Sequence, residues 1–372
     1  MIDIYEAVQH APGLIPRLYL LITVGSVYIQ SHEEGSEKIL DDLIEMMKAV
    51  QSPLRGLFLR YYFLKMCKDR LPDTGSEYET ETRGVKEAIE IIHINLTEST
   101  HLWMRIGGGR DKARRLKEKE DLKMLIGENL MRISSLEGVN VKIYKEEVLP
   151  KMLVLLKDSQ DAMTQQYLLD CMIQGFPEEF HINTLPELLA TCSRELEKDV
   201  DMKVIFIALM ERLSNYLSDN ATSIEVLGIN IYELFKVNIT ELVKSSVNNE
   251  VRSTLNLYSA FLQFTLKCYP SEYSYVNEIL KDAATFCAYN ENNIDEDCQI
   301  YISKFLIHPL ETLAHVILTM NEYPTLMRYL KFKRRREVAK QITKAVSRGS
   351  IDLTDVNVVS QLLVFINPVL KR

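Results

Sequence analysis

Apolar residues recur at three- and four-residue intervals along almost the whole chain, and short breaks separate one such run from the next. This spacing places apolar side chains on one face of a helix. The 372 residues include only 14 Gly and 11 Pro, which is too few for the frequent turns of a β-sandwich. The pattern therefore predicts an all-α protein without a confident strand.

The breaks indicate where individual helices begin and end. Ser52-Pro53 separates two helices, Leu71–Ser76 is a loop, and Gly138 ends a long helix over Arg110–Ser134. Further helices are predicted at Val141–Leu156, Asp161–Gly175, Leu185–Glu197, Met202–Leu217, Ile224–Phe235, Val251–Cys268 and Tyr273–Ala288. Alternating helices and short breaks are typical of antiparallel helix pairs that stack into an α-solenoid of the HEAT or armadillo kind. No strict sequence repeat is visible, so the pattern alone also allows a globular helical fold.

Composition narrows the class of protein. Hydrophobic residues make up 47% of the chain and charged residues 26%, as in proteins with a large buried core. The formal charge of −8 disfavours nucleic acid or an anionic membrane as a partner of the chain as a whole. The six Cys form no CxxC pair, which predicts reduced, buried thiols in a cytosolic protein. The sequence shows neither a signal-peptide pattern nor an apolar run of membrane-spanning length.

The motifs of common catalytic and metal sites are absent from the sequence. It contains no Walker loop, no HExxH and no GxSxG motif. The seven His are scattered, and His93 and His101 lie eight residues apart on one predicted helix, too far to share a metal ion. We therefore predict no catalytic, metal-binding or cofactor-binding residue.

One predicted helix, which Pro16 starts, is apolar on nearly every side. One of its faces carries Leu18, Leu21 and Gly25, and another carries Leu20, Val24 and Val27. Gly25 leaves room for a second helix to approach closely. Because a helix that is apolar all round is buried, we expect its own chain to cover one side and another protein to cover the other. The guanidinium of Arg17 needs a carboxylate or several carbonyl groups as partners, and either its own chain or another protein can supply them.

Two long motifs of the chain carry a family resemblance. Pro16-Arg17-Leu18-Tyr19-Leu20-Leu21 resembles a signature of the large retromer subunit, the family of vacuolar protein sorting-associated protein thirty-five. Pro53-Leu54-Arg55-Gly56-Leu57-Phe58-Leu59-Arg60 resembles a second signature of that family. Three shorter motifs follow in the family's order, at Leu136–Asn140, Phe176–His181 and Lys267–Pro270. The resemblance covers Ile2 to Pro270, and beyond it the helical pattern is compatible.

The resemblance implies a single HEAT-like solenoid over residues 1–372 that lacks the family's N-terminal leader and C-terminal half. It implies a non-catalytic scaffold subunit of retromer, which acts in retrograde protein transport from endosomes to the Golgi and the plasma membrane. The residues expected to dock the arrestin-fold subunit are Pro16, Arg17, Leu18, Tyr19 and Leu20. Arg55 and Arg60 either contribute to that docking or pack the next helical hairpin.

The resemblance also implies further partners and a location. These partners are sorting nexins, cargo tails and a Rab-family GTPase, and the phosphoesterase-fold subunit binds only if the C-terminal half is present. The expected location is cytoplasmic, with peripheral and indirect contact to the endosomal membrane. The alternatives are another helical-repeat trafficking or transport adaptor, or a helical enzyme with an unrecognised site. The basic run Lys331–Arg336 either contacts acidic lipid or an acidic partner, or is a solvated helix start.

Overall fold

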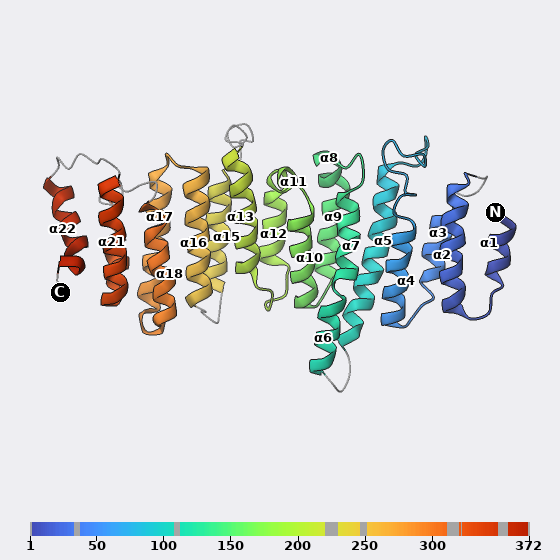
Figure 1. Ribbon diagram of the computed structural model, residues 1–372, viewed down its shortest axis with the longest axis horizontal. Helices are drawn as coiled ribbons and strands as arrows, with labels where there is room; N and C mark the ends of the chain where they lie inside the picture. Colours follow the sequence, from blue (N-terminus) through green and yellow to red (C-terminus); the bar gives the residue numbers. More distant parts are fainter. Residues whose placement is uncertain are drawn as a thin grey trace. The chain divides into compact units, whose positions relative to one another are not determined.

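The computed structural model of the protein describes residues 2–32, 38–107, 112–219, 230–245, 251–310, 320, 322–348 and 356–370. Every regular element in these ranges is helical and none is a strand, which confirms the predicted all-α class. The chain divides into two compact units, Met1–Val200 and Asp201–Arg372, and we describe each unit by itself (Figure 1).

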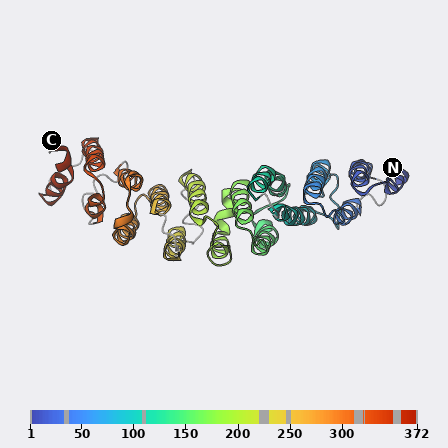
Figure 2. The same cartoon turned by 90° about the horizontal axis from the view of Figure 1, so that it is seen from below.

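The first unit is built from helix pairs that stack in two rows (Figure 2). Its elements are α1 (Ile2–Gln9), α2 (Leu14–Gln30), α3 (Ile39–Met47), α4 (Pro53–Met66), α5 (Val85–Met104), η2 (Arg105–Gly107), α6 (Lys112–Leu122), α7 (Met124–Ser134), α8 (Val141–Ile143), the π-helical turn η3 (Tyr144–Val148), α9 (Leu149–Asp158), α10 (Ala162–Gly175), α11 (Glu178–Asn183) and α12 (Leu185–Arg194). Helices α2, α4, α7 and α10 pack side by side in one row, and α3, α5 and η3 follow one another in the second.

The second unit repeats this arrangement. Its elements are α13 (Met202–Asp219), α15 (Ile231–Ser245), α16 (Val251–Cys268), α17 (Tyr273–Tyr289), η4 (Glu291–Asn293), α18 (Glu296–Ile307), α20 (Glu322–Arg328), α21 (Phe332–Arg348) and α22 (Val356–Leu370). Helices α13, α16, α18 and α21 contact one another in succession, and α17 packs against α20 on the other side. Within each unit the stacked helix pairs have the α-solenoid arrangement that the sequence predicts.

Large apolar side chains fill the space between the rows. Trp103, Phe63 and Phe176 are at most 2% exposed, and burial of each such side chain contributes about 1.5–3 kcal/mol. At Gly25 of α2, an added Cβ atom would lie 2.9 Å from Ile39 Cγ2 and 3.2 Å from Leu43 Cδ1, both on α3. The close approach of a second helix at Gly25 is therefore confirmed.

The six cysteines are free thiols, and five of them are buried. Cys171 is half-buried. Burial raises the pKa to about 12 for the thiols of Cys67, Cys192, Cys268 and Cys287. These thiols stay protonated at neutral pH and are poor nucleophiles. The predicted burial is confirmed for these four thiols and for Cys298.

Two predicted helices are interrupted in the structure. The helix predicted over Arg110–Ser134 is wrong as one element, because α6 ends at Leu122 and α7 begins at Met124. Trp103 Nε1 donates to the carbonyl of Lys119 at 2.8 Å, and the Lys123 N–H bonds Glu120 instead. A side chain that takes a helical carbonyl in this way breaks the helix.

The helix predicted over Val141–Leu156 contains the π-helical turn η3. Pro150 lies two residues after the end of this turn and has no N–H to donate to the carbonyl of Glu146, four residues earlier. Of the helix predicted at Ile224–Phe235, residues 224–229 lie outside the described residues, and α15 runs on to Ser245.

The predicted start of a helix at Pro16 is also wrong, because α2 begins at Leu14. Pro16 still lies in the first turn, where its missing N–H has no helical partner.

Candidate protein-binding surface

Helix α2 has the two apolar faces that its sequence predicts. Leu18 and Leu21 are 1% exposed and face the core, whereas Leu20 is 47% and Val27 44% exposed. The chain itself therefore covers one face of α2 and leaves the second face open. Of the residues predicted to bind a partner, Leu20 and Pro16 are exposed, Arg17 and Tyr19 are half-buried, and Leu18 is buried.

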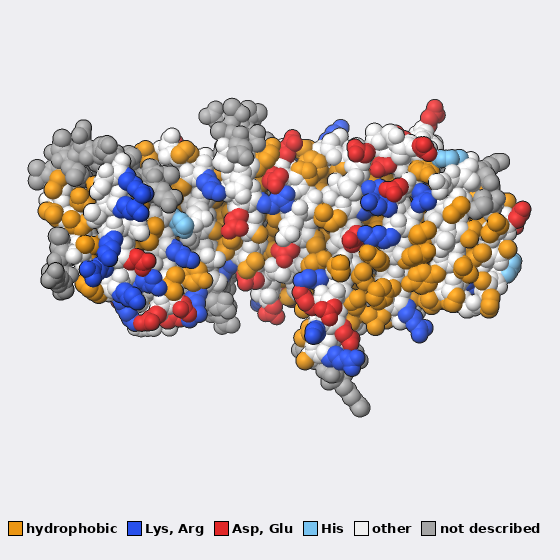
Figure 3. Space-filling view, viewed as in Figure 1, with side chains coloured by type: hydrophobic (Ala, Val, Ile, Leu, Met, Phe, Trp, Pro, Cys, Tyr) orange, Lys and Arg blue, Asp and Glu red, His pale blue; other side chains and the backbone are white. Residues whose placement is uncertain are grey.

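The open face continues across the two helices that follow α2 in the same row. We call this surface the apolar stripe, and it consists of Leu20 and Val27 on α2, Leu54 and Phe58 on α4, and Met124 and Met131 on α7. All six side chains are at least 44% exposed. Figure 3 shows hydrophobic side chains gathered over this part of the first unit. A contiguous apolar patch of this kind is typical of a protein–protein contact.

A tyrosine pair joins α2 to α4 beside the apolar stripe. The rings of Tyr19 and Tyr62 lie 5.1 Å apart, and the hydroxyls of Tyr62 and Thr23 are hydrogen-bonded at 2.8 Å. Burial, and then the proximity of Tyr62, raises the pKa of Tyr19. Because both tyrosines are half-buried, they hold the two helices together while their outer edges extend the exposed surface.

Arg17 links the first two helices of the chain. Its Nη1 donates to the carbonyl oxygen of Gln9 at 3.4 Å. Gln9 is the last residue of α1, where the carbonyl groups of a helix carry partial negative charge. The guanidinium thus bonds a carbonyl of its own chain, one of the two kinds of partner expected for it.

The two arginines of the second motif have different environments. Arg55 is exposed at the start of α4. Arg60 is only 2% exposed, and its Nη2 lies 3.8 Å from Glu98 Oε2. Burial lowers the pKa of Arg60, and Glu98 counteracts this effect. Among the described residues, Nε and Nη1 of Arg60 have no hydrogen-bond partner. Arg60 therefore belongs to the interior of the helix pair, and only Arg55 lies on the surface.

A buried amide pair that the sequence pattern did not indicate lies beside Arg60. Asn95 Nδ2 on α5 donates to Asn129 Oδ1 on α7 at 2.8 Å, and both side chains are at most 1% exposed. This hydrogen bond links α5 to α7 directly behind the apolar stripe. The part of the apolar stripe that lies on α7 is therefore supported by a specific hydrogen bond in the core.

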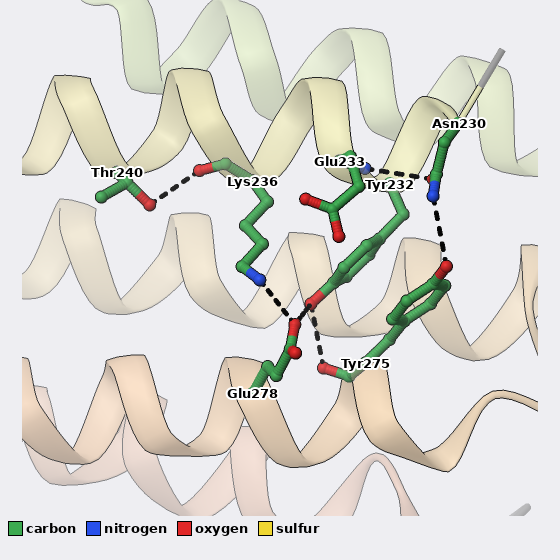
Figure 4. Close-up of polar contacts among 7 residues, drawn as sticks. All are labelled: Asn230, Tyr232, Glu233, Lys236, Thr240, Tyr275 and Glu278. Atoms are coloured by element: carbon green, nitrogen blue, oxygen red, sulfur yellow. Dashed lines mark hydrogen bonds and ion pairs between the residues drawn. The ribbon is translucent and has the colours of Figure 1, made fainter.

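The second unit contains a polar cluster between α15 and α17 (Figure 4). The Tyr232 hydroxyl lies 3.0 Å from Glu278 Oε2 and 3.2 Å from the Tyr275 carbonyl oxygen, and Lys236 Nζ lies 2.6 Å from the same Glu278 oxygen. The rings of Tyr232 and Tyr275 stack at 3.8 Å. The hydrogen bond from Lys236 holds the pKa of Glu278 below its usual value. These contacts join α15 to α17.

The described residues contain neither a metal-binding cluster nor a membrane-spanning helix. Within the described ranges, no group of three or more His, Cys, Asp or Glu side chains could hold a metal ion. No helix in the same ranges combines the length and the apolar character that crossing a bilayer requires. The stacked helix pairs and the exposed apolar stripe place the chain in the class of α-helical repeat proteins, whose repeats form extended surfaces.

Comparison with known proteins identifies the family. The family model described as "Vacuolar protein sorting-associated protein 35" matches residues 1–372, and the chain belongs to this family. It is 36% identical to vacuolar protein sorting-associated protein 35A of Arabidopsis thaliana over 377 residues, which cover 100% of the chain and 48% of that relative. It is 38% identical to vacuolar protein sorting-associated protein 35 of Dictyostelium discoideum, of which the match covers 48%. It is 28% identical to the protein of the same name from Schizosaccharomyces pombe, of which the match covers 50%. The chain thus spans about half the length of these curated relatives.

Proposed function

We propose that this chain is a non-catalytic scaffold segment of retromer, acting in retrograde protein transport from endosomes. Membership of the vacuolar protein sorting-associated protein 35 family supports the trafficking role. In this proposal the segment lies in the cytoplasm, peripheral to the endosomal membrane. Sorting nexins, cargo tails and a Rab-family GTPase bind the assembled complex, and their weak contacts add up through avidity.

The proposed docking site for the arrestin-fold subunit is the apolar stripe together with the segment Pro16–Leu20. The observation that carries this proposal is the open face of α2, where Leu20 and Val27 remain exposed beside the arginine of the first motif. Leu18 acts from the core side by holding α2 in place, and Tyr19 fixes α2 against α4 through Tyr62. Arg55 lies on the exposed side of α4 and is assigned to the rim of the site, whereas Arg60 supports it from within.

Binding of the purified arrestin-fold subunit tests the proposal. We expect Leu20→Asp and Phe58→Asp each to weaken binding at least about tenfold, because a central apolar side chain commonly contributes about 1–2 kcal/mol or more. The matched control is Val154→Asp, which changes a residue 54% exposed on α9, outside the stripe. Equal loss of binding in the control, or unchanged binding in both stripe variants, would contradict the proposed site.

Arg17→Glu tests the arginine of the motif separately. The substitution removes the hydrogen bond to Gln9 and places a negative charge beside the carbonyl end of α1. We expect binding to be abolished or greatly weakened, while the melting temperature of the chain changes little. A large fall in melting temperature would instead assign Arg17 to the stability of the α1–α2 pair, and unchanged affinity would reject its part in docking.

A further inference from the structure

Some basic residues of the run Lys331–Arg336 form ion pairs or hydrogen bonds within the described part of the chain, and the others do not. Lys331 Nζ lies 2.8 Å from Glu296 Oε1, and Arg334 Nη1 lies 2.9 Å from Glu337 Oε2. Arg335 donates to the carbonyl oxygens of Met327, Arg328 and Leu330, and so caps the C-terminal end of α20. Lys331 and Arg335 therefore hold the start of α21 against α18 and α20, and Arg334 pairs within α21 itself.

The remaining basic residues begin a longer row along α21. We call it the basic row, and it consists of Lys333, Arg336, Lys340, Lys344 and Arg348. Their spacing of three or four residues places them on one face of the helix, and all five are exposed. The row is about 22 Å long, because an α-helix rises about 1.5 Å per residue. Figure 3 shows Lys and Arg side chains following α21 from end to end.

The basic row concentrates five exposed cations, without an ion pair among the described residues, on one face of a single helix. Elsewhere, Lys and Glu on neighbouring helices commonly pair, as Lys65 does with Glu128 at 2.7 Å and Lys86 with Glu147 at 2.7 Å. None of the five cations of the row forms an ion pair with another residue that the structure describes. Residues 331–348 contain eight Lys or Arg and one acidic residue, in a chain whose net charge is −8. A concentration of unpaired like charge costs stability, so its presence points to an external anion.

We propose that the basic row binds an acidic peptide segment of a partner protein, with Asp or Glu side chains spaced along an extended chain. About seven extended residues match the length of the row. Carboxylates along such a peptide can pair with successive Lys and Arg side chains. Polar residues such as Gln341 and Ser347 flank the row, and Phe332 at its start is the one large exposed apolar side chain on α21. Charge is therefore the main feature that a ligand can recognise here.

A narrow ligand fits the surroundings better than a broad anionic surface. Glu296 lies beside the start of the row, close enough to interact with Lys333 and Arg334, and its side chain is 82% exposed. Asp297 on the same turn of α18 is 56% exposed. A membrane pressed against α21 would meet these carboxylates, whereas a peptide along the row can avoid them. A single nucleic-acid strand would need stacking aromatic side chains, and α21 offers only Phe332.

The inference goes beyond the proposed function and does not rest on it. The basic row lies on the second unit and selects acidic groups, whereas the apolar stripe lies on the first unit and selects apolar ones. Loss of one interaction therefore leaves the other testable.

Fluorescence anisotropy with labelled heptaglutamate at low salt tests the proposal on the full 372-residue chain. We expect saturable binding that weakens with added salt, and none with heptaglutamine. The triple variant Arg336→Gln/Lys340→Gln/Lys344→Gln should bind about tenfold more weakly or worse. The matched control, Lys117→Gln/Lys142→Gln/Lys198→Gln, removes the same charge from exposed positions outside the row and should bind within about twofold of the original chain.

A second variant tests the length of the row. Lys333→Gln/Arg348→Gln changes only its ends, and should weaken heptaglutamate while leaving triglutamate unaffected. Circular dichroism establishes that both row variants are folded. Equal weakening by the scattered control, or no preference for heptaglutamate over heptaglutamine, would overturn the proposal. Row-dependent capture of phosphatidylserine vesicles or of an oligonucleotide, without peptide binding, would overturn it in favour of a membrane or a nucleic acid.

Discussion

Lys119 of α6 places its ammonium group 2.7 Å from the Asp161 carboxylate at the start of α10, and the lysine side chain is only 3% exposed. The same ammonium lies 4.9 Å from the centroid of the Trp103 ring. Asp161 also accepts from the backbone N–H of Thr164 at 2.9 Å, and so caps α10. One carboxylate therefore neutralises a buried cation and begins a helix.

Asp161→Asn should lower the free energy of unfolding by about 2 kcal/mol at neutral pH, because Asn keeps the cap but leaves Lys119 buried without its counter-charge. Urea unfolding followed by circular dichroism measures the change. The matched control, Glu128→Gln, removes an exposed pair with Lys65 and should cost at most about 0.5 kcal/mol. A similar cost in both variants would contradict the special role of the buried cation.

The effect of Asp161→Asn should also depend on pH. Burial raises the pKa of Asp161, but hydrogen bonds from Lys119 and Thr164 outweigh burial and hold the pKa below the ordinary value of 3.8. Because the folded-state pKa is the lower one, the stabilisation is complete above the unfolded-state pKa and is lost as pH falls through the folded-state value. The difference between the two proteins should therefore be full at neutral pH and shrink below about pH 4. A difference independent of pH would disprove the assignment.

Loss of charge at Glu98 should destabilise the protein more than loss of charge at Arg60. Glu98→Gln leaves the buried guanidinium without its nearest carboxylate and should lower the melting temperature. Arg60→Met removes the buried charge and should change the free energy of unfolding by about 1 kcal/mol or less. In the double variant, the substitution of Glu98 should have no further cost. Greater destabilisation by Arg60→Met than by Glu98→Gln would show that packing of the arginine stem outweighs its charge.

Tyr232→Phe should destabilise the second unit by about 1–2 kcal/mol. The substitution removes a hydroxyl that bonds Glu278 and the Tyr275 carbonyl, while the stacked ring is retained. Thermal unfolding gives the change, and Tyr289→Phe is the control because Tyr289 is 86% exposed on the same helix α17. Equal melting temperatures for the two variants would mean that the cluster contributes nothing beyond its ring contact.

Small-angle scattering tests whether residues 1–372 form a single continuous solenoid. A compact chain of this length would have a radius of gyration of about 21 Å. A continuous array of helix pairs should give a clearly larger value and an asymmetric distance distribution. A radius near the compact value would reject the prediction of one continuous array.

The parts of the fold that depend on local spacing were predicted from the sequence. Helix α4 begins at Pro53, and α16 spans Val251–Cys268 as its apolar pattern indicates. The two faces of α2 also follow from spacing alone, because residues three or four positions apart share a face. Gly138, predicted to end the helix, instead lies with a φ of 91° in the turn after α7, whose C-cap is Ser135.

The remaining features depend on which helices become neighbours, and periodicity carries no such information. Trp103 interrupts a helix that starts several residues later in the sequence, by bonding the Lys119 carbonyl. The buried guanidinium is that of Arg60, whereas the sequence drew attention to Arg17, because only the packing of α4 against α5 distinguishes the two. The basic row was recognised only at its first residues, since the partners of Lys331 and Arg335 lie on the neighbouring helices α18 and α20.

The buried thiols give the protein a built-in set of probes for opening events. Cys67 and Cys192 are buried in the first unit, and Cys268, Cys287 and Cys298 are buried in the second. A thiol with a raised pKa inside the core reacts with an alkylating reagent only when the surrounding helices separate. The order in which mass spectrometry detects the labelled cysteines therefore gives the order in which neighbouring helix pairs separate, without any engineered label.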